Sequence, residues 1–138
     1  MSDLRQRCIY LARARFVLGL SLFVLPGLLS RIWVGRGGAT PAAKHHMRAA
    51  AIREMALGAG ASIALGEREH GADWLSMLAV VDAGDAVNGV ISRHLPKRLT
   101  LISLVAAASA TGHMLLARQI ADTTGARNAA SAPMPTDG

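Results

Sequence analysis

A long apolar segment with two carboxylates in its middle limits what this chain can fold into. Residues 73–92 are largely apolar or small, and Asp82 and Asp85 lie near their centre. The segment is about as long as a helix that crosses a bilayer, which needs roughly 20 residues. A charged side chain in hydrocarbon costs on the order of 3 kcal/mol, so both acids need partners or water. The rest of the chain must therefore supply groups that meet them.

A second apolar segment carries Arg53 and Glu54 about one helical turn inside its start. Side chains three apart on a helix face nearly the same way, so Asp82 and Asp85 can both point towards this neighbour. We expect Arg53 to pair with Asp82 or Asp85 across the two helices. One acid, either an aspartate or Glu54, is then left over. It would be protonated, hydrogen-bonded to Asn88 or a serine, or in contact with water.

Two further runs without acidic or basic charges indicate a membrane protein. Residues 16–30 have no charged side chain, and residues 99–117 have His113 as their only ionisable group. Helices of a soluble bundle carry a polar stripe along their exposed side, which both runs lack. Hydrophobic residues make up 51% of the chain, and its many small residues let helices approach closely. A soluble Ala-rich bundle remains the alternative, because the other two segments each carry two charges.

The basic residues lie mainly in clusters at the ends of the apolar segments, where membrane proteins keep them. The formal net charge is +6, but no aromatic stacking platform accompanies the clusters, so we expect no nucleic-acid binding. Arg13 and Arg15 are interpreted as anchors at the headgroup level, with Arg13 also considered for the bundle interior. The basic residues of the two sides tie under the positive-inside rule. The dense cluster before the first helix then favours cytoplasmic N- and C-termini of a multi-pass protein in a bacterial cell membrane.

Four helices follow from these segments, and they are expected over residues 10–26, 44–66, 73–92 and 98–118. Pro26 and Gly27 kink or end the first helix, and Pro96 breaks the chain before the last. A basic start followed by an apolar run also begins a signal peptide, but no convincing small-x-small cleavage site follows. The predicted fold class is all-α, a four-helix transmembrane bundle of up-down topology over residues 1–118. Residues 119–138 lack periodicity and are predicted to be a disordered tail.

The charged groups have three interpretations. The first is a structural network that fixes helix register, made of Arg53, Glu54, Asp82, Asp85, Asn88 and His113. The second is a site for a proton, a cation or a polar headgroup, because intramembrane acids also serve as proton relays. The third is a metal site formed by the same acids and His113, which no ligand-spacing motif supports. We therefore expect no metal.

The sequence contains no catalytic motif. The chain lacks a Gly-x-Ser-x-Gly elbow, a phosphate-binding loop, a dinucleotide fingerprint and paired cysteines, so we expect neither a catalytic residue nor a cofactor. The predicted function is that of a small integral membrane protein, a structural or accessory subunit with a buried charged network. The lipid bilayer is its expected partner, together with a second copy or a larger membrane complex. The alternative is a small proton- or cation-coupled transporter in which Asp82 and Asp85 are the coupling groups.

Two short motifs carry a family resemblance. The second predicted helix contains Arg53-Glu54-x-x-Leu57-Gly58, and the third contains Asp82-x-x-Asp85. With these motifs the chain resembles a family of small, uncharacterised bacterial membrane proteins of four helices. Pro26-Gly27 and Gly35 after the first helix are also similar to that group. The resemblance covers about residues 10–118 and implies a fold and a membrane setting, but no activity.

Overall fold

The computed structural model describes residues 2–35, 38, 40–67, 70–92 and 97–130, and within this part of the chain it is helical and has no strand. Five helices follow one another: α1 (Ser2–Val24), α2 (Pro26–Val34), α3 (Pro41–Glu67), α4 (Gly71–Ile91) and α5 (Lys97–Ala130). The first and second predicted helices are thus longer than expected at their N-terminal ends, since α1 begins at Ser2 rather than residue 10 and α3 at Pro41 rather than residue 44.

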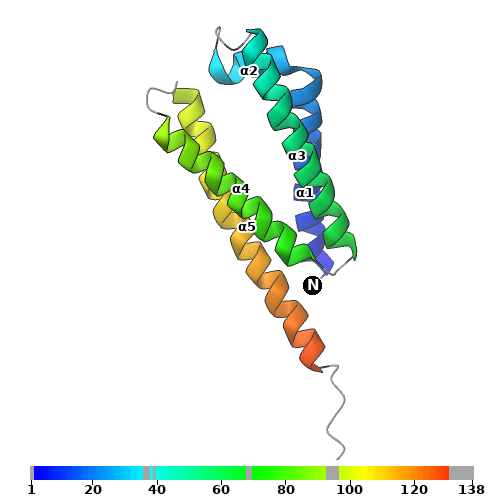
Figure 1. Ribbon diagram of the computed structural model, residues 1–138. Helices are drawn as coiled ribbons and strands as arrows, with labels where there is room; N and C mark the ends of the chain where they lie inside the picture. The colour runs from blue at the N-terminus through cyan, green and yellow to red at the C-terminus, as the bar shows by residue number, and fades with distance from the viewer. Residues whose placement is uncertain (1, 36–37, 39, 68–69, 93–96, 131–138) are drawn as a thin grey trace, which may run out of the picture.

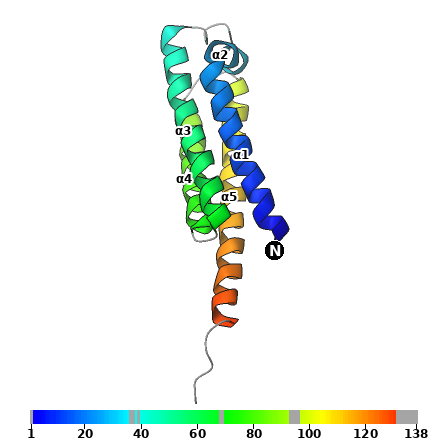
Figure 2. The ribbon, with the colours of Figure 1, turned by 90° about the vertical axis from the view of Figure 1, so that its right-hand side faces the viewer.

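The long helices form two antiparallel pairs, which we call the N-terminal pair (α1 and α3) and the C-terminal pair (α4 and α5). Figure 1 shows that the pairs lie closest near the end of α3 and the start of α4, and are further apart near α2. The short helix α2 lies across that far end and contacts α1, α3 and α5 (Figure 2). The two pairs therefore meet chiefly through α3 and α4.

Glycines bring α1 and α3 close together. A Cβ on Gly58 of α3 would lie 2.6 Å from the carbonyl oxygen of Ala12 and from the amide nitrogen of Phe16 on α1. A Cβ on Gly19 of α1 would lie 2.8 Å from the carbonyl oxygen of Ala51 on α3. Real side chains do not tolerate such distances to backbone atoms, so glycine is required on both helices where their backbones touch.

Apolar side chains are buried in two separate clusters. The larger one joins all four long helices through Cys8, Ala12, Leu57, Ala61, Leu65, Leu75, Leu78, Ala117 and Ile120. The smaller one lies towards α2 and contains Leu22, Met47 and Ala51, with Leu29 and Trp33 packed against it. On α3 the charged residues Arg53 and Glu54 lie between Ala51 of the smaller cluster and Leu57 of the larger one, and on α4 Asp82 and Asp85 follow Leu78 of the larger cluster. The charged groups therefore have an apolar neighbourhood on two sides.

The prediction of a four-helix transmembrane bundle is wrong. In the described part of the chain, two helices are long and apolar enough to cross a membrane, Gly71–Ile91 and Leu99–Ala126. The helices α1 and α2 pass the same test only as a pair, and they are bent by 101° at the break between them. The helix α3 is not among these candidates, and it carries Lys44, Arg48, Arg53, Glu54 and Glu67.

The bend between α1 and α2 follows from Pro26. Proline has no backbone N–H and its ring clashes with the preceding turn, so α1 ends at Val24 and a new helix starts with Pro26 in its first turn. The backbone hydrogen bonds of Leu25 to Ser21 and of Leu29 to Leu25 keep the chain coiled through the bend. Pro26, which was expected to kink or end the first membrane helix, therefore begins α2. This helix lies across the far end of the molecule.

The predicted disordered tail is also wrong over residues 119–130, which continue α5 to Ala130. Ile120 is buried against the larger apolar cluster, so the helix keeps a packed face beyond residue 118. The hydroxyl groups of Thr123 and Thr124 both donate to the carbonyl oxygen of Ile120, which satisfies side chains that would otherwise favour a turn. The rest of the predicted tail, residues 131–138, lies outside the described residues.

Candidate functional site

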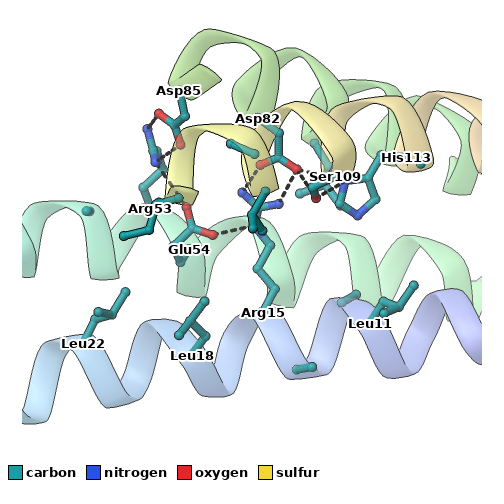
Figure 3. A pocket seen from close by; sticks show the side chains of 18 of the residues that line it. Leu11, Arg15, Leu18, Leu22, Arg53, Glu54, Asp82, Asp85, Ser109 and His113 are labelled. Atoms are coloured by element: carbon teal, nitrogen blue, oxygen red, sulfur yellow. Dashed lines mark hydrogen bonds and ion pairs between the residues drawn. The ribbon is translucent and has the colours of Figure 1, made fainter. Parts of the chain in front are cut away.

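A cavity of about 560 Å³ lies between the two helix pairs. Helices α1, α3, α4 and α5 form its walls, and Trp33 of α2 contributes at one end. Most of the wall is apolar, with side chains that include Leu11, Leu18, Leu22, Ile102, Val105 and Leu116. Its polar side chains form what we call the charged cluster: Arg15, Arg53, Glu54, Asp82, Asp85, Ser109 and His113 (Figure 3).

Arg15 of α1 connects α1 to α3 and to α4. Its Nη1 and Nη2 atoms donate to the two carboxylate oxygens of Asp82, at 3.1 and 2.6 Å. Its Nε atom lies 2.5 Å from Oε2 of Glu54. Only 12% of the Arg15 side chain is exposed. A two-pronged guanidinium–carboxylate pair is among the strongest polar contacts in proteins, so Arg15 fixes these three helices relative to one another.

Asp82 of α4 extends the cluster to α5. The hydroxyl group of Ser109 donates to its Oδ2 atom at 2.6 Å, and Nδ1 of His113 lies 3.0 Å from the same oxygen. The Asp82 side chain is 6% exposed. With Arg15 it has four donor contacts, so the cost of burying this carboxylate is offset by hydrogen bonds on both oxygens.

Arg53 and Asp85 form a second, more exposed pair. The Nη1 and Nη2 atoms of Arg53 donate to the two oxygens of Asp85 at 3.0 and 2.6 Å, and Nη2 also lies 3.3 Å from Oε1 of Glu54. The side chains of Arg53 and Asp85 are 43% and 38% exposed. Glu54 thus binds Arg53 with one oxygen and Arg15 with the other, which joins the two pairs into one continuous network.

A regular spacing places Arg15 inside the molecule. The inward positions of α1 recur three or four residues apart, as expected for one face of a helix, and they are Cys8, Ala12, Arg15, Gly19 and Leu22. The neighbouring Arg13 is exposed, on a different face. In this stripe the small residues Ala12 and Gly19 lie on either side of Arg15. This pattern is the sequence signal that distinguishes Arg15 from a basic residue at the headgroup level.

The structure brings together most of the residues singled out in the sequence. Arg53, Glu54, Asp82, Asp85 and His113 all lie in the charged cluster. The expected cross-helix pair forms between Arg53 and Asp85, whereas Asp82 meets Arg15.

Asn88 does not join the cluster. It is exposed on α4, one turn beyond Asp85, and its backbone carbonyl accepts the hydrogen bond of the Ser92 amide that caps the helix. Sequence reasoning missed Arg15 and Ser109, and Ser109 carries no signal of its own in an Ala-rich helix.

The acids of the cluster are bound to guanidinium groups rather than grouped for a metal ion. Among the described residues, no three His, Cys, Asp or Glu side chains are placed to hold a metal. Each of the three carboxylates faces at least one arginine. Carboxylates exceed guanidinium groups by one in the cluster, so its formal charge is −1 with a neutral His113. The arrangement can thus fix helices, and it presents a polar patch to an otherwise apolar cavity.

Comparisons of this chain with models of protein families, with curated proteins and with solved structures find no match. The family resemblance drawn from the two short motifs therefore stays a prediction. The geometry of the cavity and of the charged cluster is the basis on which a function can be assigned.

Proposed function

We propose that this chain is a membrane protein in which the charged cluster holds two helix pairs around a cavity that binds a small, largely apolar molecule. The cavity itself carries the proposal, with a volume of about 560 Å³. Ligand sites in proteins typically have volumes of roughly 300–1,000 Å³ and apolar walls with a few polar groups. The cavity has this size and this division between an apolar wall and one polar patch.

The exposed surface supports the membrane setting. Large apolar side chains cover the outer faces of several helices, and they include Phe16, Val17 and Leu20 of α1, Val80, Val87 and Val90 of α4, and Leu101, Leu104 and Leu115 of α5. Soluble monomers rarely expose this much contiguous apolar surface. We place α4 and α5 across the bilayer of a bacterial cell membrane. The start of α1, rich in arginine, then favours cytoplasmic termini.

The charged cluster supports the structural part of the proposal. It includes side chains from α1, α3, α4 and α5, so it acts on every long helix. Charges in an apolar setting are tolerated when they are paired and hydrogen-bonded, and Arg15, Glu54 and Asp82 are. In this role the cluster keeps the two helix pairs at a fixed separation. The cavity then persists without a ligand.

The experiment uses the position of Trp33 on the cavity wall. The variant Trp74→Phe leaves Trp33 as the only tryptophan, and Trp33→Phe leaves Trp74, which packs against the apolar cluster. The ligand is 4-bromo-4′-hydroxybiphenyl, whose bromine quenches tryptophan fluorescence on contact. In detergent we expect saturable quenching of Trp33 and only a linear, unsaturable change for Trp74.

A glycine pair tests whether the cavity is the site of quenching. Gly112 lies on the cavity wall and Gly84 does not, and a Cβ on either would meet no atom within 4 Å. Gly112→Leu, made in the Trp74→Phe background, should narrow the cavity and weaken the saturable quenching, whereas Gly84→Leu should leave it unchanged. Equal saturable quenching in the two variants would contradict the proposal.

A coupled transporter is the second candidate, and the exposure of Asp85 on the cavity wall favours it. Such a carrier would exchange the Arg53 partner of Asp85 for a proton or a cation during its cycle. If this is so, Asp85→Asn should abolish pH-driven uptake of the bromobiphenyl into proteoliposomes while its binding in detergent is retained. Equal uptake by Asp85→Asn and the unaltered protein would exclude coupling through Asp85.

A further inference from the structure

His113 is the histidine of the cavity wall, and its two ring nitrogens have different surroundings. Nδ1 lies 3.0 Å from Oδ2 of Asp82 and 3.3 Å from the hydroxyl oxygen of Ser109. Among the residues that the structure describes, none provides a hydrogen-bond partner for Nε2. The ring is largely buried yet lines the cavity (Figure 3).

The contact with Asp82 determines which nitrogen carries the proton. An ionised carboxylate only accepts hydrogen bonds, so Nδ1 of His113 must be the donor. Arg15 already makes the two-pronged contact with Asp82, so a single N–H group of a neutral imidazole completes the donors on this carboxylate. In a neutral imidazole protonated on Nδ1, the other nitrogen has a lone pair. Nε2 of His113 is therefore a hydrogen-bond acceptor fixed in orientation by Asp82.

The buried arginine and the buried acids of the cluster already pair with other charged groups of the cluster. Nη1 and Nη2 of Arg15 donate to Asp82, Nε of Arg15 lies 2.5 Å from one oxygen of Glu54, and the other oxygen of Glu54 contacts Arg53. A ligand that bound these groups would have to break buried ion pairs, which is strongly unfavourable. Nε2 of His113 accepts a hydrogen bond without such a cost. It is the natural point of polar recognition in this cavity.

We infer that the cavity selects apolar molecules that carry a hydroxyl group, an alcohol or a phenol, which donates a hydrogen bond to Nε2 of His113. The apolar walls suit a neutral donor, because an ammonium group would lose its hydration on entering them. The apolar body of the ligand lies along Leu11, Val105 and Leu116. This inference rests on the proposed function and adds to it the chemical class of the ligand.

A matched pair of ligands tests the inference. The phenol 4-bromo-4′-hydroxybiphenyl donates a hydrogen bond, and its methyl ether, 4-bromo-4′-methoxybiphenyl, has nearly the same shape but no donor. Quenching of Trp33 in the Trp74→Phe variant gives a dissociation constant for each. We expect the phenol to bind roughly tenfold more tightly than the ether, the ratio for one hydrogen bond of ordinary strength. Equal affinities would overturn the inference and leave the proposed function intact, whereas no saturable quenching by either ligand would refute the proposed function.

Histidine variants, made in the same Trp74→Phe background, identify the acceptor. His113→Phe should bring the phenol-to-ether ratio close to 1 while the ether still binds. His70→Phe should leave the ratio unchanged, because His70 is exposed at the start of α4. A preference for the phenol that persists in His113→Phe would overturn the inference.

A measurement on the unsubstituted protein covers the case in which His113→Phe does not fold. The ¹⁵N chemical shift of a neutral imidazole nitrogen changes when its lone pair accepts a hydrogen bond. In ¹⁵N-histidine-labelled protein, one Nε2 resonance should shift on addition of the phenol and stay in place on addition of the ether. Identical spectra with the two ligands would contradict the assignment of His113 as the acceptor.

Discussion

At the scale of single residues, the contribution of each charged side chain depends on how completely its partners surround it. Arg15 is nearly buried and faces two carboxylates on different helices, whereas Arg53 is partly exposed and close to the surface. Removing one partner of a buried ion pair leaves an uncompensated charge in an apolar setting, but an exposed pair is already stabilised by its surroundings. Removal of Arg15 should therefore lower the free energy of unfolding much more than removal of Arg53.

Arg15→Ala should lower the free energy of unfolding by roughly 3 kcal/mol, because it leaves Asp82 and Glu54 without their shared cation. Arg13→Ala is the matched control, since Arg13 is exposed two residues away on the same helix, and its effect should be within about 0.5 kcal/mol. Unfolding in mixed micelles, followed by circular dichroism, measures both. Equal effects would show that Arg15 is a surface anchor, as the sequence first indicated.

The two aspartates give a second test at this scale. Asp82→Asn should destabilise the protein far more than Asp85→Asn, whose pair with the half-exposed Arg53 contributes at most about 1 kcal/mol. Asp82 accepts contacts from Arg15, Ser109 and His113, and an asparagine amide would point a donor at one of them. The same unfolding measurement applies. A larger loss of unfolding free energy for Asp85→Asn than for Asp82→Asn would contradict the placement of Asp82 at the buried end of the cluster.

At the scale of the helices, glycine positions decide which faces can touch. Gly58→Ala should destabilise the protein by about 1–3 kcal/mol, because a Cβ there would meet backbone atoms of α1 and force the helices apart. Gly84→Ala is the matched change on α4, where a Cβ meets no atom within 4 Å. It should stabilise α4 by up to about 1 kcal/mol, the difference in helix propensity. Thermal unfolding of the two variants should therefore shift in opposite directions.

The helices also show what a sequence pattern can and cannot predict. The apolar run with Asp82 and Asp85 placed a helix over residues 73–92, and α4 occupies Gly71–Ile91. The pairing of Arg53 with Asp85 could be predicted because a charged side chain among apolar residues needs a partner of opposite charge. The role of Arg15 depends on the rotation of α1 about its axis, which the charge of Arg15 alone does not reveal, but which the stripe of small residues that includes Ala12 and Gly19 indicates. The 101° bend after Val24 could be expected from Pro26, but its angle is set by packing on α3 and α5.

At the scale of the whole molecule, the membrane setting can be tested with cysteines introduced into α4 in a Cys8→Ser background. Val80 is exposed midway along the helix, and Asp73 is exposed near its start. In intact cells, Val80→Cys should not react with a membrane-impermeant maleimide until the membrane is dissolved, because thiols in hydrocarbon are not ionised. Asp73→Cys should react readily from one side of the membrane. Rapid labelling of Val80→Cys from outside would exclude α4 as a spanning helix.

The four-helix transmembrane prediction failed at this same scale, because in the described part of the chain only Gly71–Ile91 and Leu99–Ala126 are each long and apolar enough to cross a membrane. The Ala- and Gly-rich helix α3 is not among these candidates, and its charged residues extend from Lys44 to Glu67. The helix α3 still packs against α4, where its Arg53 pairs with Asp85, while the buried Asp82 of α4 is bound by Arg15 of α1. The cavity between the pairs had no signal in the sequence, since it depends on how far α1 and α5 lie apart.

The charged cluster has a consequence for the order in which the chain is made. Translation produces Arg15 first, then Arg53 and Glu54, and only later Asp82, Ser109 and His113. A nascent chain that has reached the end of α3 holds two guanidinium groups at these positions and a single carboxylate to match them. Two of the three counter-ions therefore arrive with the helix that also begins the more hydrophobic half of the protein. In the proposed membrane setting, Arg15 would stay near water at the membrane surface until α4 leaves the ribosome, and the arrival of Asp82 would let α1 take its final place.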